Sequence, residues 1–188
     1  MPTVTTDDGI ELYYRSAGSG DPVVFVGECG FGAWQWAWQY EDLAGPYEAV
    51  VWDLRGTGRS DAPEGPYSVD RLAADLEAVL AANSVRDAHV VGAGLGGMVA
   101  LRYAREYTRA GTVAVFGTAA SGDRIEAEAL GELFPASDDD RALRASLSGA
   151  FSRRFRTEAS ETVEQICEWR REEDAGLDGR EAQIGALE

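Results

Sequence analysis

Short apolar runs alternate with helical patterns over the first 120 residues of the chain. Four runs have the unbroken hydrophobicity of buried parallel strands, and they cover residues 22–27, 49–53, 89–93 and 112–117. Between the second and third runs, apolar residues recur at the spacing i, i+4, i+7, i+8, at Leu72, Leu76, Val79 and Leu80. This spacing predicts a helix that Ser68 can cap. A second helix is expected from Met98 to Tyr107, so the alternation predicts a parallel sheet with helices on both faces.

The two ends of the chain follow other patterns. Residues 3–15 alternate around Asp8-Gly9, a tight-turn dipeptide, which predicts a hairpin. No strand-like run follows Phe116, and the tail has the pattern of amphipathic helices interrupted at Pro135, Gly149 and 176–179. We therefore expect an α/β core over residues 1–122 and a helical cap over residues 123–188.

The charge balance restricts the partners. The 188 residues carry 33 acidic and 17 basic side chains, a net charge of −16, which disfavours nucleic acid and anionic membranes. Every basic residue is arginine and none is lysine, a composition similar to that of proteins from salt-loving archaea. An acidic protein from a high-GC genome is the alternative. With only Cys29 and Cys167, no disulfide framework is predicted, and we expect a cytoplasmic protein without a signal peptide or membrane span.

The glycine-rich turn after the third parallel run carries the most chemical information. Residues 89–101 predict a strand, a sharp turn and a helix, which is the setting of a nucleophile elbow, G-x-S-x-G. Here the pattern is Gly92-Ala93-Gly94-Leu95-Gly96, so Gly94 stands where the nucleophilic serine would be. The same residues also satisfy G-x-G-x-x-G through Gly97, the dinucleotide fingerprint. That fingerprint lacks its acidic residue about 20 positions further on.

Two upstream segments add to this turn. Residues 52–61, Trp-Asp-Leu-Arg-Gly-Thr-Gly-Arg-Ser-Asp, match a D-x-R-G-x-G-x-S loop, and residues 23–32 contain a strand followed by Gly27-Glu28-Cys29-Gly30. With the elbow, these segments make the chain resemble the α/β-hydrolase family, in its single-cap esterase and enol-lactonase-like branch. The resemblance covers residues 10–120. It departs from the family pattern at Gly94 and at Gly27-Glu28, where the family has His-Gly.

The resemblance implies the fold and a set of site residues. It implies a mostly parallel sheet flanked by helices, with a helical cap, and a small ester- or lactone-type substrate. The oxyanion hole would use the backbone N–H groups of Leu95 and Cys29, and the pocket would include Glu28, Phe31 and Trp34. Glu28 is interpreted either as a replaced histidine with a binding role or as a solvated loop charge.

The catalytic acid and histidine of the resembled family follow two further strands, and this chain reaches Glu188 before them. His89, the only histidine, is expected to be structural because it starts the strand that leads to the elbow. We therefore predict a truncated and inactive family member without metal or cofactor. Two alternatives are a non-catalytic binding or interaction protein that uses the same pocket, and dinucleotide binding through Gly92, Gly94 and Gly97. The strand at 112–117 would be an exposed edge and a route to self-association.

Overall fold

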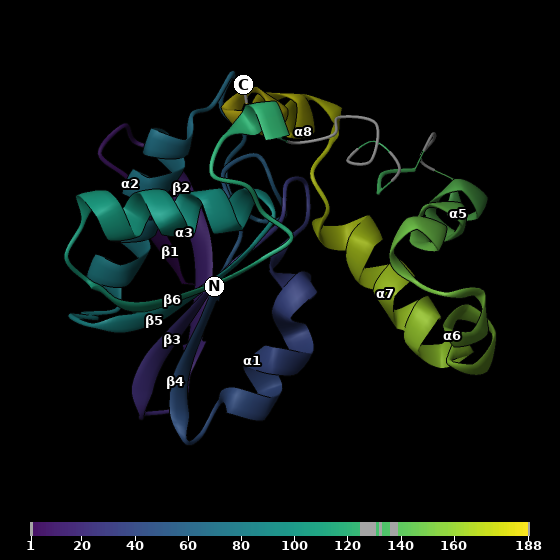
Figure 1. Cartoon of the computed structure of the whole chain (residues 1–188), viewed down its shortest axis with the longest axis horizontal. Coiled ribbons are helices and arrows are strands. Elements are labelled where there is room, and N and C mark those ends of the chain that lie inside the picture. Colours follow the sequence, from purple (N-terminus) through teal and green to yellow (C-terminus); the bar gives the residue numbers. More distant parts are fainter. Residues whose placement is uncertain (1, 125–130, 132, 136–138, 188) are drawn as a thin grey trace.

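A six-stranded sheet in the order β1-β2-β4-β3-β5-β6 forms the centre of the molecule (Figure 1). The computed structural model describes residues 2–124, 131, 133–135 and 139–187. The strands are β1 (Thr3–Thr5), β2 (Glu11–Ala17), β3 (Asp21–Val26), β4 (Tyr47–Trp52), β5 (Ala88–Ala93) and β6 (Ala110–Phe116). The sequence prediction of an α/β fold with a mostly parallel sheet is confirmed.

Strand pairing follows the sequence pattern closely. β1 and β2 pair antiparallel, with Val4 opposite Leu12, so the predicted hairpin is confirmed. β3, β4, β5 and β6 are parallel, and the register places Val24 beside Val50 and Val90. The carboxyl ends of these strands meet at one edge of the sheet, where ligand sites of α/β folds form.

Side chains of alternate residues in the central strands pack into two separate hydrophobic cores, one on each face of the sheet. Val24 and Val26 of β3 point to the face covered by α2 (Val69–Ala82) and α3 (Leu95–Glu106). Val23 and Phe25 point to the opposite face, where Trp36, Tyr40 and Leu43 cover them. β3 and β4 are thus buried on both sides, which explains their unbroken apolar runs. The run in β6 was expected to be buried as well, but its residues are exposed or half-buried because β6 is an edge strand.

The helix α2 begins as the sequence predicts. The Ser68 hydroxyl accepts a hydrogen bond from the Arg71 backbone N–H at 3.1 Å, and Asp70 lies in the first turn. Leu72, Leu76 and Leu80 are fully buried against the sheet. The predicted cap and the predicted apolar face are both confirmed.

The structure adds a helical segment that the sequence pattern did not predict. A 3₁₀ turn, η1 (Ala33–Trp36), leads into α1 (Ala37–Leu43) between β3 and β4. Figure 1 shows α1 on the face of the sheet away from α2 and α3. The aromatic residues at 34, 36, 38 and 40 alternate as in a strand. In the fold, Trp36 packs on Phe25 of the sheet, whereas Trp38 contacts Trp169 of the helix α7 (Ser160–Glu173).

Residues after β6 are helical, as expected. After the 3₁₀ turn η2 (Gly122–Arg124), the helices are α5 (Asp140–Ala150), α6 (Arg153–Glu158), α7 (Ser160–Glu173), α8 (Leu177–Ile184) and the 3₁₀ turn η3 (Gly185–Leu187). α5, α6 and α7 form a lobe beside the sheet, whereas α8 lies over α2 and α3 (Figure 1). Ala182, Ala186 and Leu187 join the main core. The division at residue 122 stays a prediction.

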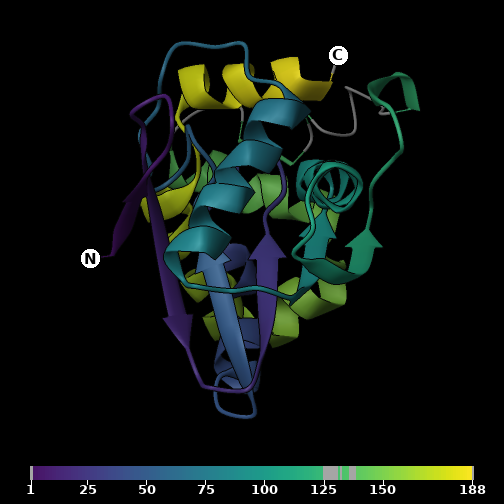
Figure 2. The ribbon, with the colours of Figure 1, turned by 90° about the vertical axis from the view of Figure 1, so that its left-hand side faces the viewer.

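β6 forms one edge of the sheet in the part of the chain that the structure describes. It pairs with β5 alone, and Figure 2 shows its outer side uncovered by another strand. Phe116 at its end is 59% exposed. No helix among the described residues is long and apolar enough to cross a membrane.

Candidate active site

The turn between β5 and α3 has the geometry of a sharp elbow. Gly94 lies between Ala93 and Leu95 and adopts φ +51°, in the left-handed region that favours glycine. A Cβ on Gly96 would approach the Val26 carbonyl oxygen to 2.3 Å, so α3 begins in direct contact with β3. The elbow predicted from the sequence is therefore formed, and its glycines have steric reasons of their own.

The carboxylate of Glu28 occupies this elbow. Its Oε1 accepts hydrogen bonds from the backbone N–H of Cys29 at 2.7 Å and from that of Leu95 at 2.8 Å. A Cβ built on Gly94 would lie 1.4 Å from Glu28 Oε2. The two N–H groups expected to form an oxyanion hole thus converge on one oxygen, and that oxygen belongs to the chain itself.

The loop that carries Glu28 is held in place at both ends. The Glu28 backbone N–H donates to Gln35 Oε1 at 2.7 Å, and the Gly30 N–H donates to Gln183 Oε1 at 2.7 Å. Gln183 is fully buried and its amide nitrogen also donates to the Arg55 carbonyl oxygen at 2.8 Å. The last helix of the described chain therefore helps to position the loop from 153 residues away.

Burial dominates the electrostatics at this position. Burial raises the pKa of the Glu28 carboxyl, and the N–H groups of Leu95 and Cys29 offset this only in part. No arginine side chain among the described residues pairs with Glu28, so its charge is held by backbone dipoles and by the start of α3. Burial, followed by the Glu28 charge, raises the pKa of the Cys29 thiol to about 12. Cys29 is therefore a neutral thiol at physiological pH.

Two of the three predicted pocket residues line one apolar cavity. Phe31 and Trp34 border a cavity of about 210 Å³ between α1 and the helices α5 and α7. Glu28 is outside this lining but binds Gln35, which belongs to it. The remaining lining residues are Trp38, Leu133, Ser146, Leu147, Ala150, Phe151, Ile166 and Arg170. The cavity is thus mostly aromatic and aliphatic.

One buried ion pair forms a polar border of this cavity. The Arg170 guanidinium donates to Asp174 at 2.7 Å and to the Ser146 hydroxyl at 2.8 Å, and it lies 4.8 Å from the centre of the Phe31 ring. Burial raises the pKa of Asp174 to about 6, although Arg170 opposes this shift. The Trp34 indole N–H also donates to Asp174 at 2.7 Å. This network connects α7 to the aromatic side chains of Phe31 and Trp34.

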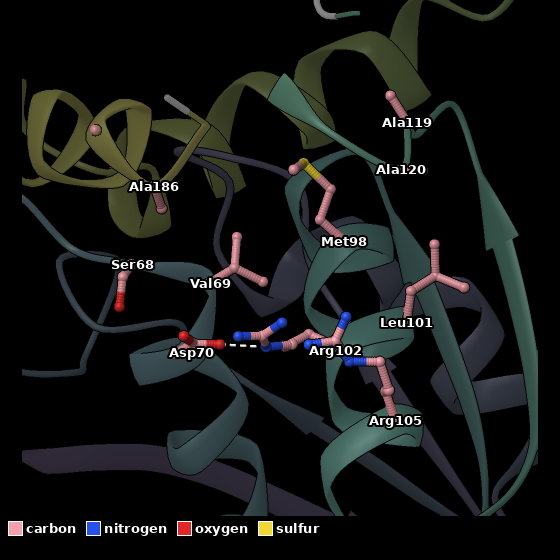
Figure 3. Close-up of a pocket in the computed structure, with 11 residues that line it drawn as sticks. Ser68, Val69, Asp70, Met98, Leu101, Arg102, Arg105, Ala119, Ala120 and Ala186 are labelled. Atoms are coloured by element: carbon pink, nitrogen blue, oxygen red, sulfur yellow. Dashed lines mark ion pairs between the residues drawn. The ribbon is translucent and has the colours of Figure 1, made fainter. Parts of the chain in front are cut away.

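A second pocket, of about 450 Å³, lies along α3 (Figure 3). Its other borders are the start of α2, η3, and the segment that follows β6. Arg102 of α3 forms an ion pair with Asp70 of α2 across this pocket. Its lining includes Met98 and Leu101 but none of the four residues Glu28, Cys29, Gly94 and Leu95. We therefore treat it as separate from the elbow.

His89 and the loop after β4 lie away from the elbow chemistry. His89 lies near the start of β5, about five residues or roughly 16 Å from Gly94. Its Nδ1 is 2.6 Å from the hydroxyl of Thr112 on β6. Arg55, in the loop after β4, pairs with Asp75 of α2 and with Asp8 of the turn between β1 and β2. Among the described residues, no cluster of histidine, cysteine and carboxylate side chains has the arrangement of a metal site.

Sequence reasoning did not establish that Glu28 and Gly94 meet. The two residues are far apart in the chain, and the side-chain direction of a loop residue has no periodicity. Their joint departure from the family pattern was the available signal, because a carboxylate takes the space that a missing side chain leaves.

Comparison with known proteins agrees with this geometry. A model of the alpha/beta hydrolase fold family matches residues 22–164. The chain belongs to the α/β-hydrolase fold family. A hydrolase from Pseudomonas aeruginosa PA01 superposes with a TM-score of 0.80 at 25% identity, covering 99% of this chain and 71% of that one. Est816, an N-acyl homoserine lactone degrading enzyme, superposes with a TM-score of 0.77 at 27% identity, covering 100% of this chain and 75% of that one.

Sequence relatives match a shorter region. The "Putative carbamate hydrolase RutD" of Azorhizobium caulinodans is 39% identical over 94 residues, which is 50% of this chain and 36% of that protein. A non-heme chloroperoxidase of Streptomyces lividans is 38% identical over 106 residues, covering 55% of this chain and 38% of the relative. The chain spans little more than a third of the length of these curated relatives.

Proposed function

We propose that this α/β-hydrolase family member binds a small organic molecule and does not hydrolyse esters or lactones. The supporting observation is the Glu28 carboxylate, which fills the space beside Gly94 and accepts both N–H groups that a reacting carbonyl oxygen would need. A catalytic acid and histidine supplied from elsewhere would still leave the elbow without a hydroxyl. The absence of a hydroxyl at position 94 is therefore sufficient for the expected loss of ester hydrolysis.

The ligand class follows from the relatives and from the cavity. The similar proteins include one named as a putative carbamate hydrolase and one named as a lactone degrading enzyme, which favours an ester- or lactone-type small molecule. The cavity bordered by Phe31, Trp34 and Trp38 offers aromatic and aliphatic contacts. Such a lining favours a ligand with an apolar body.

An ester hydrolysis assay tests the catalytic half of the proposal. We expect 4-nitrophenyl acetate to be hydrolysed by the purified chain at the buffer rate, because no side chain at position 94 can attack. Cys29→Ala serves as a control for acyl transfer to the thiol. Saturable turnover that persists in this variant would show that the proposal is wrong.

Tryptophan fluorescence tests the binding half with the same ester as probe. We expect saturable quenching, because Trp34 and Trp38 border the cavity. Leu147→Trp fills the cavity from α5 and is expected to weaken the affinity at least about ten-fold, which is about 1.4 kcal/mol. Leu177→Trp adds the same side chain at an exposed site and should leave the affinity unchanged. Equal quenching in both variants would contradict binding at this cavity.

The geometry favours the elbow over dinucleotide binding. A Cβ on Gly97 would collide with Thr118 at 2.6 Å, and a Cβ on Gly92 would collide with Gly96, so packing accounts for these glycines. The Leu95 N–H, which would face a pyrophosphate, is taken by Glu28. A thermal shift with NAD would be expected to show no change.

Self-association through β6 is a further part of the proposal. The strand is uncharged, and its residues alternate between exposed and half-buried. In a protein with net charge −16, such an edge offers a neutral route for a second copy to add a strand. Sedimentation at several concentrations should show association that Val115→Arg removes. A monomer at all concentrations would contradict it.

A further inference from the structure

The pocket of about 450 Å³ along α3 has an apolar part and a cationic part (Figure 3). Four of its lining residues lie on α3 at the spacing i, i+3, i+4, i+7, and they are Met98, Leu101, Arg102 and Arg105. This spacing puts them on one face of the helix. Along that face the two apolar side chains come first and the two guanidinium groups follow.

The apolar part is completed by three other segments of the chain. Val69 at the start of α2, Ala186 of η3, and Ala119 and Ala120 after β6 also line the pocket. Leu101 is 42% exposed, so the described chain leaves this apolar side chain partly uncovered. The volume and this lining are typical of pockets that hold small organic molecules.

The cationic part is a local exception in an acidic protein. The net charge of the chain is −16, yet the described lining contains two arginines and a single carboxylate, Asp70, which pairs with Arg102. The Arg105 side chain is 68% exposed and pairs with its neighbour Glu106 at 2.9 Å. Because an exposed ion pair contributes little, a bound anion can take the place of Glu106.

We propose that this pocket binds a small organic anion, a carboxylate with an unbranched apolar chain. Arg105 holds the carboxylate, Arg102 adds a second positive charge, and the apolar chain lies over Leu101 and Met98. The pocket is lined by none of the residues of the elbow, and it is separate from the cavity between α1, α5 and α7. The inference therefore goes beyond the proposed function.

Both parts of the pocket define the ligand. A guanidinium presents parallel N–H groups that match the two oxygens of a carboxylate, so a neutral ligand would leave these donors unused. A small inorganic anion would leave Met98 and Leu101 facing water. The seven residues from Met98 to Arg105 rise by about 10 Å along the helix axis, which an extended chain of about eight carbons spans.

Isothermal titration calorimetry of the whole chain with sodium octanoate at neutral pH tests the proposal. We expect saturable binding of one octanoate per chain. Octanamide has the same chain without the charge, and acetate has the charge without the chain. Each is expected to bind at least about ten-fold more weakly than octanoate, because each loses the contacts of one part of the pocket.

Two substitutions with matched controls locate the site. Arg105→Gln and Leu101→Gln should each weaken the octanoate affinity at least about ten-fold. Arg154→Gln removes an exposed arginine of α6 that also pairs with a glutamate, and it should leave the affinity unchanged. Leu177→Gln, at an exposed leucine of α8, should also leave it unchanged. Thermal melts confirm that each variant is folded.

A third substitution has the opposite sign. Asp70→Asn removes the carboxylate that competes with the ligand for Arg102, so octanoate should bind about two- to five-fold more tightly. A residue that acts only on stability would not tighten binding. Unchanged or weaker binding in Asp70→Asn would contradict the role of Arg102.

The inference is overturned if octanoate does not bind saturably, if octanamide binds equally well, or if Arg105→Gln and Leu101→Gln leave the affinity unchanged. Leu147→Trp fills the cavity between α1, α5 and α7, and it should not affect octanoate. Loss of octanoate binding in this variant would place the ligand in that cavity and would also overturn the inference. The ester assay and the fluorescence titration of the proposed function do not depend on Arg105, so the two failures can be told apart.

Discussion

Asp53 and Glu28 are two carboxylates with the same local arrangement and different surroundings. Each follows a neighbouring parallel strand, accepts backbone N–H groups and lies against a glycine with positive φ. Asp53 accepts from Ala33 and Arg59 backbone N–H groups, and a Cβ on Gly58 (φ +55°) would lie 2.5 Å from it. Glu28 has the same relation to Gly94 (φ +51°).

The difference between the two is a cation. The Arg59 guanidinium donates to the Asp53 carboxylate at 2.9 Å and forms an ion pair with Glu173 of α7 at 3.0 Å. It also lies 3.8 Å from the centre of the Tyr13 ring. Asp53 is fully buried, and its charge is compensated. Glu28 has no such partner among the described residues. We infer that Asp53 is structural and that Glu28 is retained for binding.

The largest expected effect is on Asp53. Asp53→Asn directs an amide group at the Arg59 donors and removes the buried carboxylate of this ion pair, so the free energy of unfolding should fall by about 3–5 kcal/mol. Urea unfolding measures this loss. Asp42→Asn, at an exposed site on α1, is the matched control and should change stability little. A loss of under 1 kcal/mol at Asp53 would remove the structural side of the comparison.

The collision between positions 28 and 94 gives the next effect. Gly94→Ser combines a strained φ with a contact to Glu28, so we expect a loss of about 1–3 kcal/mol. Gly117→Ser is the matched control, because Gly117 has φ +55° and open space around its Cβ position. The excess loss at position 94 measures the collision.

A double variant then isolates the pair. Glu28→Gly removes the carboxylate, so Gly94→Ser should cost less in that background, with a coupling of about 0.5–3 kcal/mol. Equal costs in both backgrounds would mean that Glu28 does not occupy the elbow.

The contrast also explains how far the sequence could lead. The four parallel strands, the hairpin and the Ser68 cap follow from local patterns, because burial and capping depend on nearby residues. The exposed β6 edge was expected from the resembled fold and not from a local pattern. The sequence also predicted that Gly94 stands at the nucleophile position, and this stays a prediction.

The placement of Glu28 required the fold, because its carboxylate meets Leu95 across 67 residues. Helix α1 was missed for another reason. The tryptophans in and before this helix contact two different neighbours, because Trp36 packs on the sheet and Trp38 packs on α7. Their spacing therefore does not show the single apolar face by which a helix is recognised.

The smallest expected effect concerns the pH dependence of stability. Because burial raises the Glu28 pKa above its ordinary value, the folded protein binds a proton more tightly than the unfolded chain. Stability from this group is therefore present at low pH and lost as pH rises through the raised pKa. Glu28→Gln has no such titration, so it should be more stable than the parent at neutral pH by about 1 kcal/mol, with the difference vanishing near pH 4.

Thermal or urea unfolding of both proteins between about pH 4 and pH 8 measures this difference across the ordinary glutamate pKa. Glu41→Gln, at an exposed site on α1, should change stability little across this range. A difference that is constant with pH, or that favours the parent at neutral pH, would show that the two N–H groups compensate the Glu28 charge fully. The charge of Glu28 would then be as well compensated as that of Asp53, and the distinction between the two carboxylates would fail.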